Sequence, residues 1–144
     1  MSPQRLSEEY PDTSMAERLP LVMEVEIAMT DGVITTLEGE VAYRAGDAIV
    51  TGTQGERWPV QRKRFEATYS PCAGTHFGSS GRYQRELLSV LARCLEAPME
   101  IRLSDNRGVL RGQAGDWLVE YDPGDRAIIA DAIFRQTYRI VPMN

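Results

Sequence analysis

The chain contains two similar 25-residue stretches that can be aligned with each other without a gap. This repeat constrains the fold more than any other feature. The first reads AGDAIVTGTQGERWPVQRKRFEATY (Ala45–Tyr69) and the second AGDWLVEYDPGDRAIIADAIFRQTY (Ala114–Tyr138). Nine aligned positions are identical: Ala45/Ala114, Gly46/Gly115, Asp47/Asp116, Val50/Val119, Gly55/Gly124, Arg57/Arg126, Phe65/Phe134, Thr68/Thr137 and Tyr69/Tyr138. Chance gives about one or two identities, because even common residues each hold only about 7% of positions. We therefore expect two copies of one structural unit that bury their apolar faces against each other.

Each copy has the pattern of a strand, a hairpin turn, a returning strand and a short helix. "AGD" is typical of a tight turn that leads into a strand, since glycine tolerates positive φ and aspartate accepts hydrogen bonds from turn amides. The shared glycine of "TQGER" and "DPGDR" marks the hairpin. Pro59 in the returning strand requires a sheet edge or a bulge. Each phenylalanine precedes a tyrosine by four positions, which places both rings on one helix face, and Asp131 is positioned to cap the second helix.

Further strands are expected upstream of each copy. "MEVEIAM" (Met23–Met29) alternates apolar and acidic residues, and we take "MEIRL" (Met99–Leu103) as its counterpart. A β-branched stretch broken at Gly39 follows the first. "RELLSVLARCLEAP" is ambiguous, because its leucine spacing favours a helix while Ser89–Leu95 also fits a strand.

These patterns predict an α+β, mainly antiparallel β protein, with two pseudo-symmetric β-rich repeats, each ending in a short helix, packed as one domain. We divide the chain into a mobile tail (1–18), a first repeat (19–69), a Gly/Ser-rich linker (70–81) and a second repeat (82–144).

Composition excludes several classes of protein. The 42% of hydrophobic and 26% of charged residues are typical of a globular domain. The formal net charge of −5 disfavours nucleic acid as a partner. No apolar run is long enough for a membrane span, and the polar start lacks the apolar core of a signal peptide, so we expect a cytoplasmic protein. Cys72 and Cys94 are expected to remain unpaired.

Catalytic motifs are almost lacking. The single histidine, His76, lies in the glycine-rich linker, and no spacing indicates a zinc or phosphate-loop site. We predict no catalytic residue, no metal and no cofactor. Turn carboxylates are candidates for acid–base chemistry, but backbone capping is the simpler interpretation; they are Asp47, Asp116, Glu56 and Asp125.

Aromatic and cationic residues near the hairpins form the one candidate ligand-binding set. A tryptophan beside an arginine can stack on a planar ligand while the guanidinium binds an anion. The competing interpretation is that both tryptophans anchor the core. The candidate set is Arg57, Trp58, Trp117, Tyr121 and Arg126.

With these motifs the chain resembles the PGDYG family, bacterial and phage-associated proteins of unknown function. The resemblance covers Thr36–Tyr69 and Gly81–Tyr138. The naming motif is present only as Pro123, Gly124 and Asp125, followed by arginine and alanine where the family has tyrosine and glycine. The resemblance implies a strand at Ser89–Leu95, and it carries no catalytic residue.

Three functions are compatible with these sequence features. The first is a non-enzymatic accessory protein that holds a small anionic or nucleotide-like ligand between the repeats or at a homodimer interface. The second is a protein–protein interaction module that uses an exposed sheet edge or apolar patch. The third is a metal-assisted hydrolase built on Asp47, Asp116 or Glu56.

Overall fold

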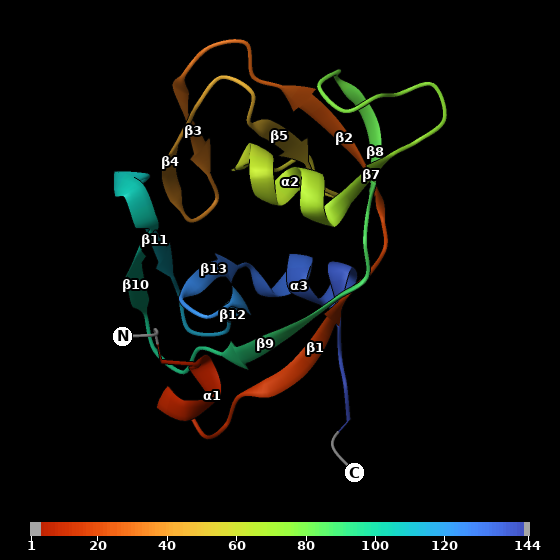
Figure 1. Cartoon of the computed structure of the whole chain (residues 1–144). Coiled ribbons are helices and arrows are strands. Elements are labelled where there is room, and N and C mark those ends of the chain that lie inside the picture. The colour runs from red at the N-terminus through yellow and green to blue at the C-terminus, as the bar shows by residue number, and fades with distance from the viewer. Residues whose placement is uncertain (1–3, 143–144) are drawn as a thin grey trace. The chain divides into compact units, whose positions relative to one another are not determined.

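The chain forms two compact units in a computed structural model that describes residues 4–142. Unit 2 is the continuous segment Pro20–Glu86, and unit 1 combines the residues up to Leu19 with those from Leu87 onward. All strand pairs in both units are antiparallel, and the only helices among the described residues are short (Figure 1). The predicted α+β, mainly antiparallel β class is confirmed.

Unit 2 is built around a sheet with the strand order β6-β5-β2-β8-β7, accompanied by a β3–β4 hairpin. Its elements are β2 (Val22–Ile27), β3 (Gly32–Thr36), β4 (Gly39–Tyr43), β5 (Ala48–Thr51), β6 (Arg57–Val60), α2 (Arg62–Thr68), β7 (Tyr69–Pro71) and β8 (Gly81–Arg85). Pro59 lies on β6 at the sheet edge, as its missing N–H requires.

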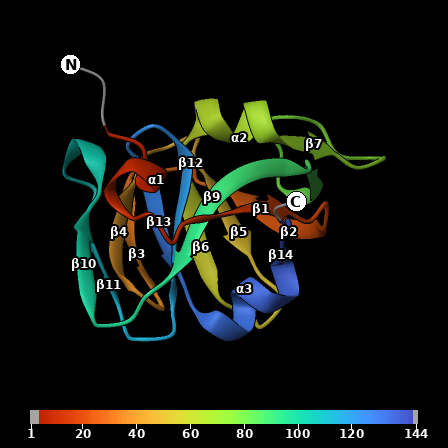
Figure 2. The same ribbon diagram turned by 90° about the horizontal axis from the view of Figure 1, so that it is seen from below.

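Unit 1 has a sheet with the order β13-β12-β9-β1-β14 and a β10–β11 hairpin. Its elements are α1 (Leu6–Glu9), β1 (Ser14–Arg18), β9 (Leu88–Cys94), β10 (Met99–Arg102), the 3₁₀ turn η1 (Ser104–Asn106), β11 (Val109–Gly112), β12 (Trp117–Asp122), β13 (Asp125–Ile129), α3 (Asp131–Thr137) and β14 (Tyr138–Ile140). In the view of Figure 2, α1 lies beside the ends of β12 and β13.

When the strands are matched by their positions in the repeat, β5 with β12, β6 with β13 and β7 with β14, the two sheets have the same strand order. Each sheet also contains one strand that the predicted boundaries assign to a different part of the chain. The predicted tail is not observed for residues 4–18: they form α1 and β1, and β1 pairs with both β9 and β14. Similarly, β8 (Gly81–Arg85) spans the end of the predicted linker and the start of the predicted second repeat, but it pairs with β2 and β7. Residues 1–3 of the predicted tail lie outside the described part of the chain.

The counterpart of Met23–Met29 is also different from the predicted one. β2 pairs with β5 and β8, and the strand with the matching neighbours in unit 1 is β9, which pairs with β12 and β1. Met99–Leu103 instead gives β10, which forms a hairpin with β11 as β3 does with β4. The prediction was wrong because alternation identifies a strand without identifying its partners. At β9 the strand implied by the family resemblance is confirmed, and the leucine spacing that favoured a helix was misleading.

The shared turn and helix residues occupy matching local structures. Gly46 and Gly115 have φ of 93° and 97°, where a side chain would be strained. Asp47 Oδ2 and Asp116 Oδ2 then accept the amides of Arg44 and Gln113, both at 2.9 Å. These contacts confirm backbone capping by the two aspartates.

Each unit has its own aromatic core under its helix. In unit 2 the Phe65 ring lies 4.7 Å from Tyr69 and 4.8 Å from Tyr83. In unit 1 Phe134 stacks between Trp117 at 4.1 Å and Tyr138 at 5.0 Å. The two rings of each pair are therefore in contact as predicted, but they do not share a helix: Tyr69 and Tyr138 are the extended C-cap residues that begin β7 and β14. Asp131 does not cap α3, because Ala130 is the N-cap residue and the Asp131 carboxylate instead accepts Trp117 Nε1–H at 2.9 Å.

Candidate functional site

A pocket of about 400 Å³ lies entirely within unit 1. Three segments that are distant in sequence form its walls: the N-terminal segment, the end of β10 with the start of η1, and the β12–β13 turn. The lining residues are Gln4, Glu9, Ile101, Arg102, Leu103, Ser104, Gly124, Asp125 and Arg126. The pocket thus brings the predicted residue Arg126 together with residues that the sequence patterns had assigned to a mobile tail.

Arg126 holds the N-terminal segment against the β12–β13 hairpin. Its Nε donates to Glu120 Oε2 at 3.0 Å, and its two terminal nitrogens donate to Glu9 at 3.2 and 2.7 Å. A further bond of 2.9 Å goes to the carbonyl oxygen of Gln4. Most of its donors are therefore used within the protein, and the hydrogen bond with Glu9 and that with Glu120 raise the pKa of the Arg126 guanidinium.

Glu120 is the buried anion of this network. Its residue is 0% exposed, and its Oε1 accepts Arg5 Nε at 2.7 Å and the Leu6 amide at 3.2 Å. Burial alone would raise the pKa of the Glu120 carboxyl, but the hydrogen bonds from Arg5, Arg126 and the Leu6 amide hold it below its ordinary value. A buried carboxylate bound by two arginines is a strong local anchor for α1.

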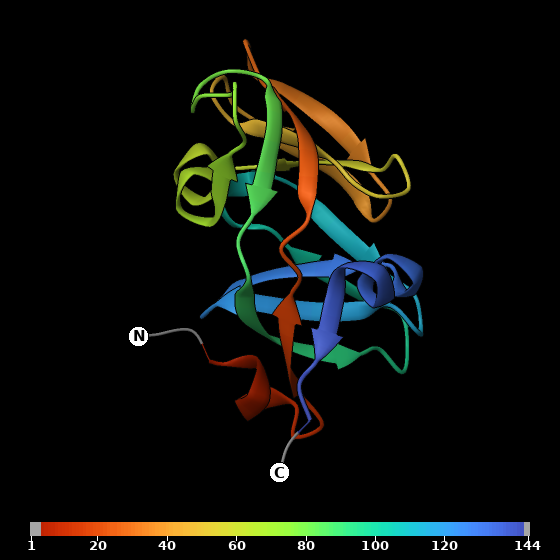
Figure 3. The same ribbon diagram turned by 90° about the vertical axis from the view of Figure 1, so that its right-hand side faces the viewer.

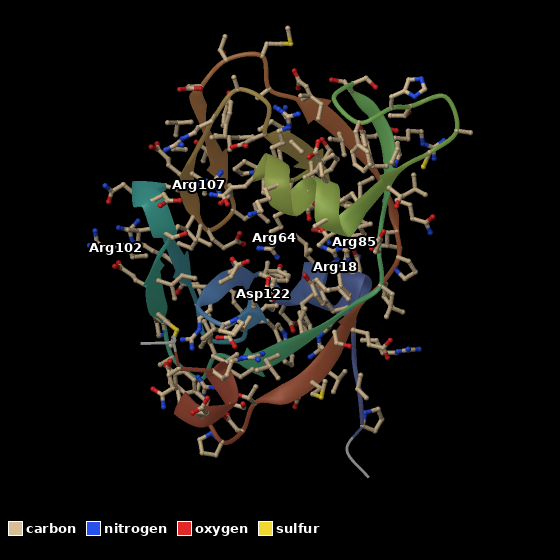
Figure 4. The ribbon with its side chains drawn as sticks, in the orientation of Figure 1. Arg18, Arg64, Arg85, Arg102, Arg107 and Asp122 are labelled. Carbon is tan, nitrogen blue, oxygen red and sulfur yellow. The ribbon has the colours of Figure 1, made fainter. Side chains whose placement is uncertain are left out.

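Arg102 is the cation in the pocket that is not committed to a carboxylate. It is exposed at the end of β10, where Figure 4 labels it. No ion pair joins it to any residue in the described range 4–142. Arg111, on the neighbouring strand of the same hairpin, binds Glu100 at 2.8 Å instead. Arg102 can therefore offer its guanidinium donors to an anion in the pocket.

Trp117 and Tyr121, both predicted as ligand contacts, pack against the buried core of unit 1. Trp117 is stacked on Phe134, and its one N–H is bound to Asp131. The Tyr121 hydroxyl lies 2.9 Å from that of Tyr138. The core interpretation of these aromatic residues is thus the one that their contacts favour, because their rings and polar groups already have partners.

Arg57 and Trp58 lie in unit 2. Trp58 is partly buried and packs against the core formed by residues such as Val50 and Phe65. Arg57 binds Glu26 at 2.9 Å, with both side chains well exposed. The five predicted residues are thus divided between the units, and only Arg126 lines the pocket.

The candidate carboxylates of the hydrolase hypothesis mostly bind backbone amides. Besides the Arg44 amide, Asp47 accepts the Arg62 amide at 3.0 Å. Glu56 Oε1 accepts the Gln54 amide at 2.9 Å, while its buried Oε2 has no hydrogen-bond partner in the described structure. Within residues 4–142 no group of three His, Cys, Asp or Glu side chains is placed to hold a metal ion. Cys72 and Cys94 are both free thiols.

Sequence reasoning missed Glu120, Arg102 and the N-terminal segment. The available signal for Glu120 was its place inside the apolar run of β12, where a charged residue is rare unless it is paired. Its partner Arg5 is 115 positions away, so no local pattern connects the two.

The fold places the chain among mainly antiparallel β proteins, here with two units whose sheets have matching strand orders. The model of the family described as PGDYG protein matches residues 39–139, and the chain belongs to this family. No curated protein and no solved structure matches it. In the described part of the chain, no helix has the length and apolar character to cross a membrane.

Proposed function

We propose that the protein is a non-enzymatic binding protein whose unit 1 pocket holds a small anionic, nucleotide-like ligand. The observation that carries this proposal is that Arg102, which has no carboxylate partner among the described residues, is one of the residues that line a pocket of about 400 Å³. That volume lies within the roughly 300–1,000 Å³ of small-molecule sites. A planar guanidinium suits phosphate and carboxylate groups, because it can donate two parallel hydrogen bonds.

Several other pocket residues support an anion held beside a less polar group, although Asp125 adds a second carboxylate to the lining besides Glu9. Ser104 adds a hydroxyl, and Ile101 and Leu103 add apolar side chains on the same wall. Glu9, which also lines the pocket, is neutralised by Arg126, since the two are joined by hydrogen bonds as short as 2.7 Å. The hydrogen bond from Arg126 also keeps the pKa of the Glu9 carboxyl below its ordinary value, so Glu9 remains bound to Arg126 at neutral pH.

A thermal-shift panel of nucleotides and inorganic phosphate tests the proposal. A ligand that binds only the folded protein raises the melting temperature, because it stabilises by RT ln(1 + [L]/Kd). Arg102→Ala should abolish the shift. The matched control is Arg111→Ala, which removes an exposed arginine from the paired strand but leaves the pocket lining unchanged. An unshifted wild-type protein across the panel, or an equal shift in Arg102→Ala, would contradict the proposal.

A protein–protein interaction module is the second candidate, and exposed apolar side chains in unit 2 favour it. Met29, Val33 and Leu37, on or next to the β3 strand, are 88%, 61% and 63% exposed. Exposed large apolar side chains mark an interaction site where they form a contiguous patch. Self-association is the simplest case. Light scattering of the wild type and of Val33→Ser/Leu37→Ser tests it: a concentration-dependent dimer that the variant loses supports this candidate, and a monomer in both contradicts self-association.

A further inference from the structure

Each sheet is completed by a strand from the other half of the chain. β1, at the start of the first half, lies between β9 and β14; β8, at the start of the second half, lies between β2 and β7. The registers match as well, since Arg18 stands opposite Leu88 and Tyr138, while Arg85 stands opposite Tyr69. In Figure 3 the chain passes directly from β1 into β2 and from β8 into β9.

Local turn chemistry disfavours the alternative in which each first strand folds back onto its own half. If β1 took the place of β8 beside β2, Arg18 would replace Arg85, whose amide donates to Leu21 O at 2.9 Å. Only Leu19 and Pro20 would remain for the hairpin loop. Two-residue hairpins need positive φ at the first central residue, where leucine is strained, and proline is confined to φ near −65°. Glu86 and Leu87, at the other connection, lack the required glycine or asparagine in the same way.

Core shape gives a second, independent reason. In unit 2 the fully buried Tyr83 of β8 packs on Phe65, and its hydroxyl donates to the carbonyl oxygens of His76 or Ser79 at 2.6 and 2.7 Å. The aligned position in β1 is Ala16, which is opposite Val90 as Tyr83 is opposite Met23.

Unit 1 compensates for this small residue with rings from β12. Trp117 and Tyr121 pack against its core, and the repeat aligns them with Ala48 and Gly52 in unit 2. A strand with alanine would therefore leave a cavity in unit 2, and a strand with tyrosine would overpack unit 1. The place between β2 and β7 therefore fits β8 and not β1, and the place between β9 and β14 fits β1 and not β8.

We propose that the two halves of this chain are specific binding partners, each of which captures the first strand of the other through these two positions. The partner surface in unit 2 is the gap between β2 and β7, which requires a β-strand bearing an aromatic residue at position 83. The surface in unit 1 is the gap between β9 and β14, which requires a small residue at position 16. The halves should accordingly recognise each other as separate chains.

Cleavage of the full-length protein tests this proposal. A site-specific protease sequence inserted between Ala73 and Gly74, both exposed in the loop between β7 and β8, allows the folded protein to be cut. Wild-type fragments should remain associated at low micromolar concentration and elute with the intact 16.1 kDa chain. Fragments that separate at this concentration would overturn the proposal.

Variants in β8 test the role of the aromatic residue. Tyr83→Ala should raise the Kd between the cleaved halves by about 100-fold or more, because truncation of a buried aromatic residue leaves a cavity. Arg82→Ala is the matched control: Arg82 is on the same strand but exposed, and its contact with Glu24 is 3.6 Å, so the Kd should change by less than about threefold. An equal Kd for Tyr83→Ala and Arg82→Ala would overturn the proposal.

A combined variant remains informative even if Tyr83→Ala fails to fold. It exchanges the two residues, Ala16→Tyr and Tyr83→Ala, and replaces both connections with hairpin turns, Leu19→Asn/Pro20→Gly and Glu86→Asn/Leu87→Gly. Each half should then fold back on itself, and the cleaved protein should elute as two separate folded halves. Association as tight as in the wild type would contradict the proposed selectivity.

Discussion

Unit 1 and unit 2 share a strand order but obtain their core rings from different places. In unit 2, β8 supplies Tyr83 and the loop before it supplies Phe77, and both rings contact Phe65. In unit 1, β12 supplies Trp117 and Tyr121, and the captured strand contributes only Ala16. One backbone arrangement thus accepts opposite distributions of side-chain volume, provided that the total filling of each core is preserved.

The same arginine of the repeat also has opposite environments in the two units. The Arg57 side chain is 46% exposed and binds the exposed Glu26, whereas that of Arg126 is 18% exposed and binds the buried Glu120. The difference comes from the N-terminal segment, which covers Glu120 in unit 1 through Arg5 and Leu6. An arginine at the same position of both repeats therefore contributes differently to stability, because residues distant in sequence determine its environment.

The greatest loss of stability should follow truncation of the phenylalanine at the centre of each core. Phe134→Ala should lower the free energy of unfolding by about 3–5 kcal/mol, because a buried ring is replaced by a cavity. Phe65→Ala, its aligned partner, should cost a similar amount, since both rings are 2% exposed. Urea unfolding of both variants measures this. A cost below about 1 kcal/mol in one unit would show that the two cores are not equivalent.

Removal of the buried Glu120 carboxylate should reduce stability more than removal of the exposed Glu26 carboxylate in unit 2. Glu120→Gln should lower the free energy of unfolding by about 3 kcal/mol at pH 7, because two arginines lose a buried partner. Glu26→Gln, which removes the exposed partner of Arg57, should cost less than about 1 kcal/mol. Chemical denaturation of the two variants checks this difference, and equal costs would show that burial does not distinguish the two arginines.

Acid should weaken the N-terminal anchor. The pKa values of Glu120 and Glu9 lie below their ordinary value of 4.5, so their contribution is complete above pH 4.5 and is lost as the pH falls through their folded-state pKa values. The charged groups around them are Arg5 and Arg126. The cost of Glu120→Gln should therefore decrease between pH 7 and pH 3 in urea unfolding, and a constant cost would contradict the assignment.

A smaller effect is expected at the indole of Trp117, which has no equivalent in unit 2 because Ala48 is aligned with it. Asp131→Asn should retain an acceptor for Trp117 Nε1–H, whereas Asp131→Ala should lower the melting temperature by a few degrees through the lost hydrogen bond. The hydrogen bond with Trp117 and then that with Arg135 keep the pKa of Asp131 low, so the acceptor is ionised at neutral pH. Thermal unfolding of the two variants provides the measurement, and equal melting temperatures would contradict the role of this bond.

Sequence reasoning identified the local structures and failed on the partners of the strands. The turns at Gly46 and Gly115, the helices that carry Phe65 and Phe134, and the edge position of Pro59 all follow from residue chemistry over short distances. The assignment of β1 and β8 to opposite units does not, since strand pairing across more than about 50 positions depends on the complete core rather than on local patterns.

The candidate site was predicted only in part for the same reason. Arg126 was recognised as a cation near a hairpin, and it does line the pocket. Arg102 was overlooked because an arginine in an alternating strand resembles any solvent-facing residue. What distinguishes it from Arg111 is the position of Glu100, which binds one arginine and not the other.

Backbone nuclear Overhauser effects in the intact protein give the decisive test of the exchange of first strands. Strand exchange predicts contacts between β1 and β9, with Ala16 opposite Val90, and between β8 and β2, with Tyr83 opposite Met23. Contacts that join β1 to β2 and β8 to β9 as two hairpins would contradict it.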